Sequence, residues 1–541
     1  MLVCATFSGR IHYTQLKVMC NPFLRGGSLL LFFALLSANL TAQVTATLTV
    51  DTEGGEHQIS RHIYGHFAEH LGRNIYDGFF VGEENKVIPN TAGVRNDIIQ
   101  ALKDLHIPNL RWPGGCFADT YHWKDGIGPK EDRPTIVNQW WGGVTEDNSF
   151  GTHDFLNLCE VLETEPYLSA NVGSGSVQEV ADWIQYTNHP GESPMAKLRR
   201  ENGREEPWNV TYWGVGNEAW GCGGNMTPEF YADVYRRYAT FMEDWNREDS
   251  TGIVKIASGA SSNDYNWTRV LMENLKLNMV DALALHHYSV TDWTYKGPST
   301  EYDEAQYFNT MEVALAMDTL IQKHTAIMDE FDPQKRIALY VDEWGGWYEV
   351  EPGTNPGFLY QQNTMRDAMI AGATLNIFNN YAERVKMANL AQAVNVLQAV
   401  ILTEGEKMIL TPTYHVMKMY IPHHDATLLP SEFDTAPTYD FEGKSIPALT
   451  ASASRDASGN LHVSLVNIDA SKTHTVAINL GSVNADAVTA QILTSDALQN
   501  YNHFDAPDKI TPAAYSDFTT SGGNLQVTLP PFSVVVLEMQ P

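Results

Sequence analysis

The sequence predicts an α/β protein, a (β/α)8 TIM barrel with an appended C-terminal antiparallel β-sandwich. Between about residues 60 and 420, eight short apolar runs alternate with longer amphipathic stretches, the pattern of repeated βα units. Beyond about residue 420 the helical periodicity gives way to short alternating runs separated by turn residues, which is typical of a sandwich. A doubly wound sheet is the alternative for the first part, but no GxGxxG follows the first predicted strand.

Periodicity locates the individual elements. The predicted barrel strands are residues 63–67, 109–112, 167–172, 212–216, 254–258, 282–285, 337–341 and 388–394. Helical patterns between them include residues 96–105, 177–186, 228–245 and 302–331. The predicted sandwich strands are residues 449–454, 461–467, 474–480, 488–493, 524–529 and 533–539. Residues 45–50 also alternate like a strand, and we expect them to pair into the sandwich.

We expect four segments: a signal peptide at 1–42, an N-terminal strand segment at 43–57, a catalytic barrel at 58–420 and a β-sandwich at 421–541. The first 42 residues contain three basic and no acidic side chains, and the apolar run 28–36 is too short to span a bilayer. This pattern predicts a secretory signal, with Met1 or Met19 as the start, and hence a secreted or periplasmic protein free of the membrane after cleavage. The alternative is a buried helix or short anchor.

The composition excludes several classes of protein. With 43% hydrophobic residues among 541, the chain is not disordered. Its 65 acidic and 35 basic residues give a net charge of −30, which disfavours nucleic acid and anionic lipid and favours neutral substrates. Aromatic residues make up 11%, which suits stacking on sugar rings and equally suits a core.

The cysteines after the predicted signal are Cys116, Cys159 and Cys222. Because their number is odd, at least one is free or pairs with another chain, and the protein is not a disulfide scaffold. No CxxC occurs, which argues against a zinc site built from thiolates. We expect no metal and no cofactor.

Two predicted strands lead directly into carboxylates. The run from residue 212 ends in Asn217 and Glu218, and the run from residue 337 ends in Asp342 and Glu343. Strand C-termini form the catalytic face of a βα barrel, and strands four and seven lie across its mouth. Two carboxylates there fit retaining glycoside hydrolysis, which needs them only ~5 Å apart. A structural ion pair is the alternative for either residue. Trp344 and Trp347 follow the second pair.

One further motif has a metal-binding alternative. His66-Phe-Ala-Glu-His70 matches the HxxEH pattern of inverted zinc proteases. That chemistry needs both histidines on one face of a helix, whereas the preceding residues predict a strand, on which positions i and i+4 lie ~13 Å apart. We therefore do not expect a zinc protease.

The motifs together resemble those of α-L-arabinofuranosidases of glycoside hydrolase family 51, from about residue 45 to the C-terminus. Six segments occur in the order found in that family, and the family's barrel-plus-sandwich fold agrees with the prediction above. They are Gly65-His-Phe-Ala-Glu-His-Leu-Gly-Arg73, Arg111-Trp-Pro-Gly-Gly115 with Asp125-Gly-Ile-Gly-Pro129, Trp213-Gly-Val-Gly-Asn-Glu218, Leu285-His-His-Tyr288, Asp342-Glu-Trp344 and Ala391-Gln-Ala-Val-Asn395.

The resemblance implies a role for each matching residue. Glu218 would be the general acid/base and Glu343 the nucleophile of a retaining mechanism. The expected substrate contacts or supports are Glu69, Arg111, Asn217, His286, Tyr288 and Gln392. Among them, Asn217 would bind the sugar 2-hydroxyl, Arg111 would keep the nucleophile ionised, His286 would lie beside the acid/base and Tyr288 would donate to the nucleophile. Core packing for His286 or Tyr288, and a barrel-mouth ion pair for Arg111, are the alternatives.

Cys116 departs from the family pattern, because many members have a substrate-binding Asn after Pro-Gly-Gly. We expect Cys116 to line the pocket, with a place in the inert core as the alternative. Because a thiol is a weak hydrogen-bond donor, we expect one sugar contact to be weaker or rerouted.

The expected function is a secreted, exo-acting, retaining α-L-arabinofuranosidase that acts on arabinose-containing plant polysaccharides, such as arabinoxylan or arabinan, or on their oligosaccharides. The alternatives are another retaining barrel glycosidase, of β-glucanase or xylanase type, and a silent carbohydrate-binding protein. The resemblance also allows a homo-oligomer, whose number of subunits no feature of the sequence sets.

Overall fold

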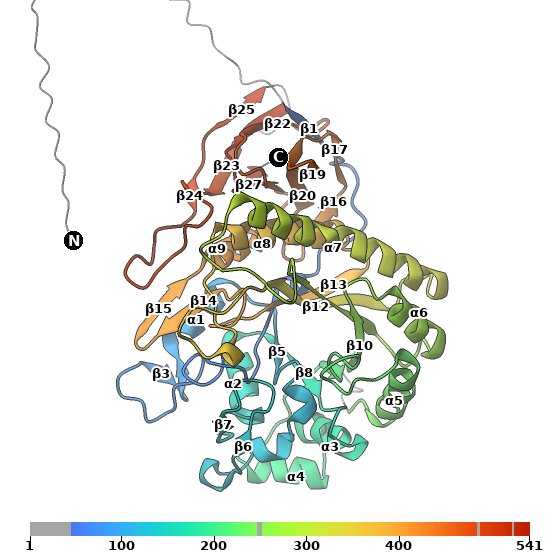
Figure 1. Cartoon of the computed structure of the whole chain (residues 1–541). Helices are drawn as coiled ribbons and strands as arrows, with labels where there is room; N and C mark the ends of the chain where they lie inside the picture. The colour runs from blue at the N-terminus through green and yellow to red at the C-terminus, as the bar shows by residue number, and fades with distance from the viewer. Residues whose placement is uncertain (1–44, 246–251, 484–486, 522–523, 541) are drawn as a thin grey trace, which may run out of the picture. The chain divides into compact units, whose positions relative to one another are not determined.

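Eight parallel strands form a closed barrel in the computed structural model, which describes residues 45–245, 252–483, 487–521 and 524–540 (Figure 1). The strands follow one another around the barrel in chain order, and the eighth pairs with the first. They are β2 (Gly65–Phe67), β5 (Asn109–Trp112), β8 (Glu165–Ala170), β9 (Tyr212–Val215), β10 (Val254–Ser261), β11 (Ala282–Ser289), β12 (Ala338–Gly346) and β13 (Val385–Ala391). The predicted fold class is thus confirmed, whereas the predicted signal peptide at 1–42 lies outside the described residues.

Helices follow most barrel strands and cover the outside of the barrel (Figure 1). They are α1 (Asn96–Asp104), α2 (Thr152–Leu162), α3 (Val177–Asn188), α4 (Pro194–Glu201), α5 (Pro228–Phe241), α6 (Tyr265–Asn274), α7 (Glu304–Phe331), α8 (Met365–Asn380) and α9 (Pro412–Met419). Capping residues set several starts: Asp303 and Gln306 form a capping box at α7, and Thr227 precedes Pro228 at α5. Among the described residues, none of the helices is both long enough and apolar enough to pass through a bilayer.

The ends of the barrel sequence depart from the prediction. Residues 61–64 form a 3-10 helix rather than the start of the first strand, because the Ser60 hydroxyl accepts a hydrogen bond from the His62 amide. The last strand lies three residues earlier than predicted, at Val385–Ala391. The chain leaves the ladder after Ala391, where the Ala393 amide donates to the carbonyl of Phe67. Gln392 therefore stands just beyond the last strand.

The C-terminal region contains two facing sheets. One has the order β17-β1-β22-β26-β25 and the other β16-β20-β21-β27-β23-β24. Their strands are β1 (Ala46–Val50), β16 (Thr427–Leu429), β17 (Ser431–Thr435), β20 (Leu449–Arg455), β21 (Leu461–Asn467), β22 (His474–Asn479), β23 (Ala487–Leu493), β24 (Ala513–Ala514), β25 (Phe518–Ser521), β26 (Asn524–Leu529) and β27 (Ser533–Gln540). All neighbouring pairs are antiparallel except β1 with β22, which is parallel. The N-terminal strand β1 thus enters the middle of the first sheet.

Short two-stranded antiparallel ribbons occur in addition to the barrel and the two larger sheets. They are β3 (Asn90–Thr91) with β4 (Val94–Arg95), β6 (Ile136–Val137) with β7 (Thr145–Glu146), β14 (Ile401–Glu404) with β15 (Lys407–Leu410), and β18 (Thr438–Phe441) with β19 (Lys444–Pro447). Periodicity did not predict them, because two- to four-residue strands are shorter than the pattern it detects.

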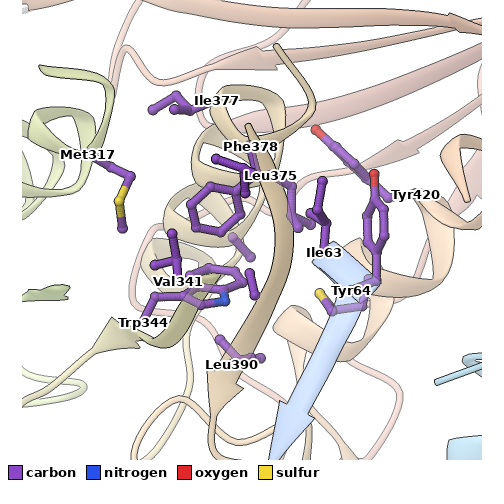
Figure 2. Close-up of a cluster of buried hydrophobic side chains, with 14 of the residues drawn as sticks. Ile63, Tyr64, Met317, Val341, Trp344, Leu375, Ile377, Phe378, Leu390 and Tyr420 are labelled. Atoms are coloured by element: carbon purple, nitrogen blue, oxygen red, sulfur yellow. The ribbon is translucent and has the colours of Figure 1, made fainter. Parts of the chain in front are cut away.

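Helix α8 joins the barrel to the sandwich. Fifteen of its sixteen residues are buried, which is expected of a helix that is covered on all sides. Toward the barrel, Phe378 packs edge-to-face on Trp344 of β12, with ring centroids 5.4 Å apart (Figure 2). Toward the sandwich, Asn379 donates to the hydroxyl of Ser452 on β20 at 3.1 Å. The helix therefore gives the outer surface of strand β12 a fixed apolar support.

Candidate active site

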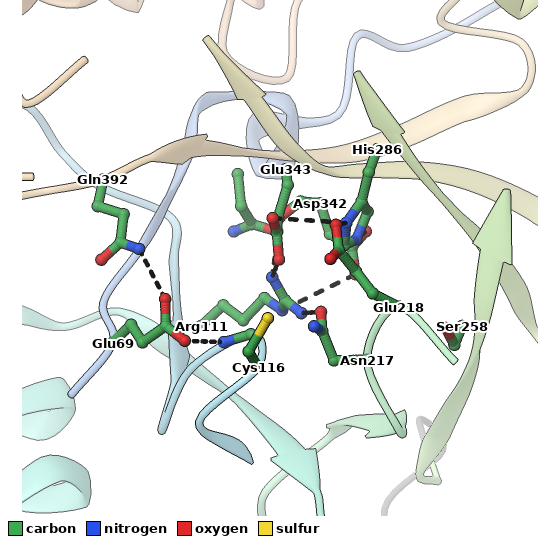
Figure 3. Close-up of polar contacts among 12 residues, drawn as sticks. Glu69, Arg111, Cys116, Asn217, Glu218, Ser258, His286, Asp342, Glu343 and Gln392 are labelled. Atoms are coloured by element: carbon green, nitrogen blue, oxygen red, sulfur yellow. Dashed lines mark hydrogen bonds and ion pairs between the residues drawn. The ribbon is translucent and has the colours of Figure 1, made fainter. Parts of the chain in front are cut away.

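Glu218 and Glu343 meet at the mouth of the barrel (Figure 3). Glu343 lies on β12, and Glu218 follows β9 after Gly216 and Asn217. One carboxylate oxygen of each residue lies within 4.8 Å of the other. The amide of Ala219 donates to the hydroxyl of Ser258 on β10 at 3.1 Å, which ties the turn that carries Glu218 to the neighbouring strand. The pair has the spacing that a retaining glycosidase requires.

Each oxygen of Glu343 accepts a hydrogen bond from a different residue. Arg111, on β5, donates from Nη1 to Oε1 at 2.8 Å, and Tyr288, on β11, donates from its hydroxyl to Oε2 at 2.8 Å. Gly115 lies so close that a Cβ there would come within 2.9 Å of Oε1. The Pro-Gly-Gly segment thus has glycine where the backbone passes against the carboxylate.

Arg111 also connects Glu343 to Asn217. Its Nη2 donates to Oδ1 of Asn217 at 2.6 Å, and its guanidinium lies 4.5 Å from the ring centroid of Phe67. Burial lowers the pKa of Arg111, but the negative charges of Asp342 and Glu343 raise it by more than burial lowers it. The guanidinium therefore stays charged. Oδ1 of Asn217 is thus occupied, and its Nδ2 group donates to Sγ of Cys222 at 3.9 Å beside the pocket that Asn217 lines.

His286, at the end of β11, links both glutamates to Asp342. Its Nδ1 lies 2.9 Å from Glu218 Oε1 and 3.4 Å from Glu343 Oε2, and its Nε2 lies 3.0 Å from Asp342 Oδ1. Burial lowers the pKa of His286, but the three carboxylates raise it to about 10. Burial and the Glu343 charge raise the pKa of Glu218, while the hydrogen bond from His286 lowers it. An imidazolium beside a protonatable glutamate is an arrangement suited to general acid/base chemistry.

Four donors converge on Glu69, in the loop after β2. Its Oε1 accepts from the amides of Gly115 and Phe117 and from Trp141 Nε1 at 2.9–3.1 Å, and its Oε2 accepts from Gln392 Nε2 at 3.0 Å. Burial and the charge of Glu343 raise the pKa of Glu69 to about 7, against the lowering effect of these hydrogen bonds. All eight residues named from the sequence are therefore brought together in one place.

A small pocket of about 60 Å³ lies between them. Its polar wall is formed by Glu69, Asn217, Glu218, Tyr288, Glu343 and Gln392. Arg111 and His286 contact the glutamates but do not line this pocket. Apolar and sulfur-containing side chains complete its wall: Leu71, Cys116, Trp141, Trp347, Leu359 and Leu397. Trp344, in contrast, is buried against α8, because successive residues of a strand point to opposite faces. Of the two tryptophans that follow Glu343, only Trp347 reaches the pocket.

Cys116 lines the pocket as predicted, but it has no thiol to donate. It forms a disulfide with Cys222, which connects the loop after β5 to the loop after β9. The Sγ atom of Cys222 lies 3.5 Å from Oε2 of Glu218. Cys159 is free and buried. It is the unpaired cysteine that the odd number of cysteines predicts. The two paired residues are 106 positions apart, and only the fold reveals that they meet.

The residues of the HxxEH motif separate. Glu69 points into the pocket, whereas His70 pairs with Glu146 at 2.9 Å and stacks on Phe117. Within the described parts of the chain, two groups of side chains have the spacing of metal ligands: Glu218 with His286 and Glu343, and Glu218 with the two disulfide-bonded cysteines. Both groups include Glu218, which lines the pocket.

Three supporting residues were not found by sequence reasoning. The carboxylate of Asp119 accepts hydrogen bonds from the backbone amides of Val172, Gly173 and Asn217, and it therefore fixes the turn before Glu218. Asp342 holds His286, and Trp141 holds Glu69. Asp342 alone had a signal, its place beside Glu343 at a strand end. Asp119 lies in a three-residue 3-10 helix and Trp141 in a loop, and neither segment has a periodic pattern.

Two family models match the chain. The α-L-arabinofuranosidase 1 domain matches residues 101–307, and the α-L-arabinofuranosidase C-terminal domain matches residues 342–533. A protein of Bacteroides ovatus, named intracellular exo-α-L-arabinofuranosidase, is 51% identical over 94% of this chain and 98% of its own length. The crystal structure of the family 51 arabinofuranosidase of Xanthomonas axonopodis has 48% identity and a TM-score of 0.90, over 92% of this chain and all of that one. An arabinose complex of the Thermotoga maritima α-L-arabinofuranosidase has 30% identity and a TM-score of 0.80 over the same shares.

These relatives correct one expectation. The prediction of a secreted or periplasmic protein is contradicted by the Bacteroides ovatus relative, which is named as intracellular. A basic, apolar N-terminal stretch is a compositional pattern and was insufficient evidence for export. The sequence identity, the matching domains and the shared fold all indicate one family. This chain belongs to the α-L-arabinofuranosidases of glycoside hydrolase family 51.

Proposed function

We propose that this α-L-arabinofuranosidase removes terminal α-L-arabinofuranosyl residues from arabinoxylan, arabinan or their oligosaccharides by a retaining double displacement. The observation that carries the proposal is the approach of Glu218 and Glu343 to within 4.8 Å across the barrel mouth. An inverting enzyme would need room for a water molecule between the carboxyl groups and a separation of about 6.5–9.5 Å.

Glu343 is the nucleophile of this scheme. Attack by one of its oxygens on the anomeric carbon forms a covalent glycosyl–enzyme intermediate and breaks the glycosidic bond. Arg111 and Tyr288 donate to its two oxygens, which holds the carboxylate in one orientation.

Glu218 is the general acid and then the general base. It first protonates the departing oxygen, and it afterwards takes a proton from the water that attacks the intermediate. Burial and the charge of Glu343 raise its pKa, as a general acid requires. When Glu343 becomes esterified its charge disappears, and the pKa of Glu218 falls toward the value suited to a base.

The other pocket residues bind the sugar. The Nδ2 group of Asn217 is the donor for the 2-hydroxyl, a contact that strengthens as positive charge develops at the anomeric carbon. Glu69 and Gln392 bind other hydroxyls from the opposite side of the pocket. Asn74 donates to Oε1 of Gln392, which leaves the side-chain amide of Gln392 in one orientation.

The test uses 4-nitrophenyl α-L-arabinofuranoside, with the β-D-xylopyranoside and β-D-glucopyranoside as alternatives. We expect release from the arabinofuranoside, loss of activity in Glu343→Ala by a factor of about 10⁴ or more, and rescue of Glu218→Ala by azide with formation of the α-azide. A β-azide from Glu218→Ala would contradict the assigned roles. Activity on a pyranoside alone would favour the glucanase or xylanase alternative, and arabinan and arabinoxylan digests would rank the natural substrates.

A further inference from the structure

Two sulfur atoms and a carboxylate meet beside the catalytic pocket. Sγ of Cys222 lies 3.5 Å from Oε2 of Glu218, and Cys116 is joined to Cys222 across a Cα–Cα distance of 5.4 Å. One ligand atom from each of the three residues lies within 4.8 Å of the other two, which is the spacing of metal ligands. Zn²⁺ accepts thiolate and carboxylate ligands, but the sulfurs of a disulfide are not thiolates.

The disulfide is open to a reductant from solvent. Cys116, Cys222 and Glu218 are only half-buried, and Cys116 and Glu218 line the pocket. A water-soluble phosphine breaks the S–S bond and takes up the oxygen atom of a water molecule, while the two hydrogen atoms of that water complete two protein thiols. A dithiol gives the same two thiols by exchange and is itself oxidised to a disulfide.

Backbone contacts that do not involve sulfur hold each cysteine in place. The amides of the two residues that flank Cys116 both donate to Oε1 of Glu69, at 2.9 and 3.1 Å. The amides of the two residues that flank Cys222 both donate to the carbonyl of Glu218, at 2.7 and 3.1 Å. Reduction therefore leaves the two thiols close to each other and beside the same carboxylate.

The second group with metal-ligand spacing, Glu218 with His286 and Glu343, is less suited to a cation. Both nitrogens of His286 are engaged with carboxylate oxygens, at 2.9 and 3.0 Å, so the imidazole has no lone pair to offer. Glu343 already accepts hydrogen bonds on both oxygens, and one of its donors is the guanidinium of Arg111, which repels a cation. A metal ion near Glu218 therefore finds its other ligands on the sulfur side.

We propose that reduction of the Cys116–Cys222 disulfide creates a zinc site from the two sulfurs and Glu218, and that zinc bound there inhibits the enzyme reversibly. The two thiols release their protons as the metal binds, and the fourth tetrahedral position is left to water. Glu218 then holds the metal and can neither protonate a leaving group nor activate water. Soft thiolate ligands select Zn²⁺ over Mg²⁺. The metal site itself does not depend on the proposed function, whereas the inhibition rests on it.

Metal binding is measured first, without substrate. Wild type is reduced with the phosphine, separated from it under argon and titrated with Co²⁺, which gives a sulfur-to-metal charge-transfer band when thiolates bind. We expect about one Co²⁺ per chain, displaced by Zn²⁺, in the reduced protein and no band in the oxidised protein. Cys159→Ala should behave like wild type, because Cys159 is buried and lies outside the site. A disulfide that resists the phosphine, or a reduced protein without the band, would overturn the proposal.

Inhibition is measured with 4-nitrophenyl α-L-arabinofuranoside. In reduced wild type, Zn²⁺ at about ten times its dissociation constant should lower kcat/KM about tenfold, and EDTA should restore the value of the reduced, metal-free enzyme. The same Zn²⁺ concentration should change oxidised wild type by less than about twofold, and Mg²⁺ should change neither form. Equal inhibition of both forms would overturn the proposal, because the metal would then act at another place.

Two variants test the ligands. Cys116→Ser/Cys222→Ser, with its folding checked by a melting curve, should bind Zn²⁺ about 100-fold more weakly than reduced wild type, or worse. Glu218→Gln keeps both sulfurs, so it should keep the Co²⁺ band and bind about tenfold more weakly. Wild-type affinity in either variant would remove the replaced side chains from the site. Oxidised wild type inactive on the arabinofuranoside would instead contradict the proposed function, and the Co²⁺ titration would still report on the metal site.

Discussion

Nδ1 of His286 lies 2.9 Å from Oε1 of Glu218. His286 reaches this position from the neighbouring strand β11, while its Nε2 is held by Asp342. Because the carboxylates raise the pKa of His286 to about 10, the imidazole is a cation over the whole range in which a glycosidase works. Its charge therefore acts on Glu218 continuously and sets the pH at which that residue loses its proton.

Replacing His286 should change the pH dependence of the enzyme. A neighbouring cation favours the ionised carboxylate, so His286→Asn should raise the pKa of Glu218 and move the alkaline limb of the kcat/KM profile to higher pH. We also expect kcat/KM at the optimum to fall about tenfold or more, because Glu218 is less firmly held. The measurement is a pH–rate profile with the 4-nitrophenyl arabinofuranoside. A limb that stays in place or moves to lower pH would contradict the assignment.

The adjacent His287 provides the control. It pairs with Ser262 and with the carbonyl of Val313, away from both glutamates, and burial lowers its pKa. His287→Asn should leave the alkaline limb where it is in wild type.

Arg111→Lys tests whether geometry or charge matters at the nucleophile. Lysine keeps the positive charge but cannot donate to Glu343 and Asn217 at once, because it lacks the planar fork of arginine. We expect kcat/KM to fall about 100-fold, the effect of a misplaced reacting group, with the folded structure retained. Steady-state kinetics and a melting curve check both parts. Near-wild-type activity would show that the charge alone is sufficient.

Most of the barrel could be predicted from the sequence, because the strands are apolar runs and several of the covering helices have an amphipathic pattern, although α8 is buried on all sides. The same logic predicted the position of Glu218 and Glu343, since barrel strands deliver their last residues to one mouth. The remaining site residues came from resemblance to a family rather than from periodicity. Trp344 illustrates the limit: it follows Glu343 directly, yet strand alternation turns it toward α8.

Contacts between loops could not be predicted. The disulfide between Cys116 and Cys222, and the hydrogen bonds of Asp119 to the turn before Glu218, join segments about 100 residues apart in the chain. Loop conformation depends on tertiary contacts that a single sequence does not display. The parallel pairing of β1 with β22 has a similar origin, because β1 comes from the opposite end of the chain and enters its sheet independently of the hairpins.

The Cys116–Cys222 disulfide should stabilise the fold and the position of Glu218. It closes a loop of 106 residues, so the Cys116→Ser/Cys222→Ser variant should lose about 2–4 kcal/mol of unfolding free energy. We expect a reducing agent to lower the melting temperature and kcat of wild type and to leave the double variant unaffected. Cys159→Ala separates this effect from loss of the free thiol, since it should keep the response to the reducing agent. Equal stability of wild type in oxidised and reduced form would refute the prediction.

Gly115→Ala should damage catalysis more than folding. A methyl group there would lie 2.9 Å from Glu343 Oε1 and 3.3 Å from Asn217 Nδ2, which is closer than carbon normally approaches either atom. The carboxylate would have to shift away from Arg111 and from the sugar, and a displacement of about 1 Å can cost about 100-fold in kcat/KM. Gly221→Ala is the matched variant, because its methyl group would meet nothing nearer than 3.7 Å in the same region. We expect that variant to retain most activity. If both variants lost activity equally, the close approach of Gly115 to Glu343 would not explain the loss.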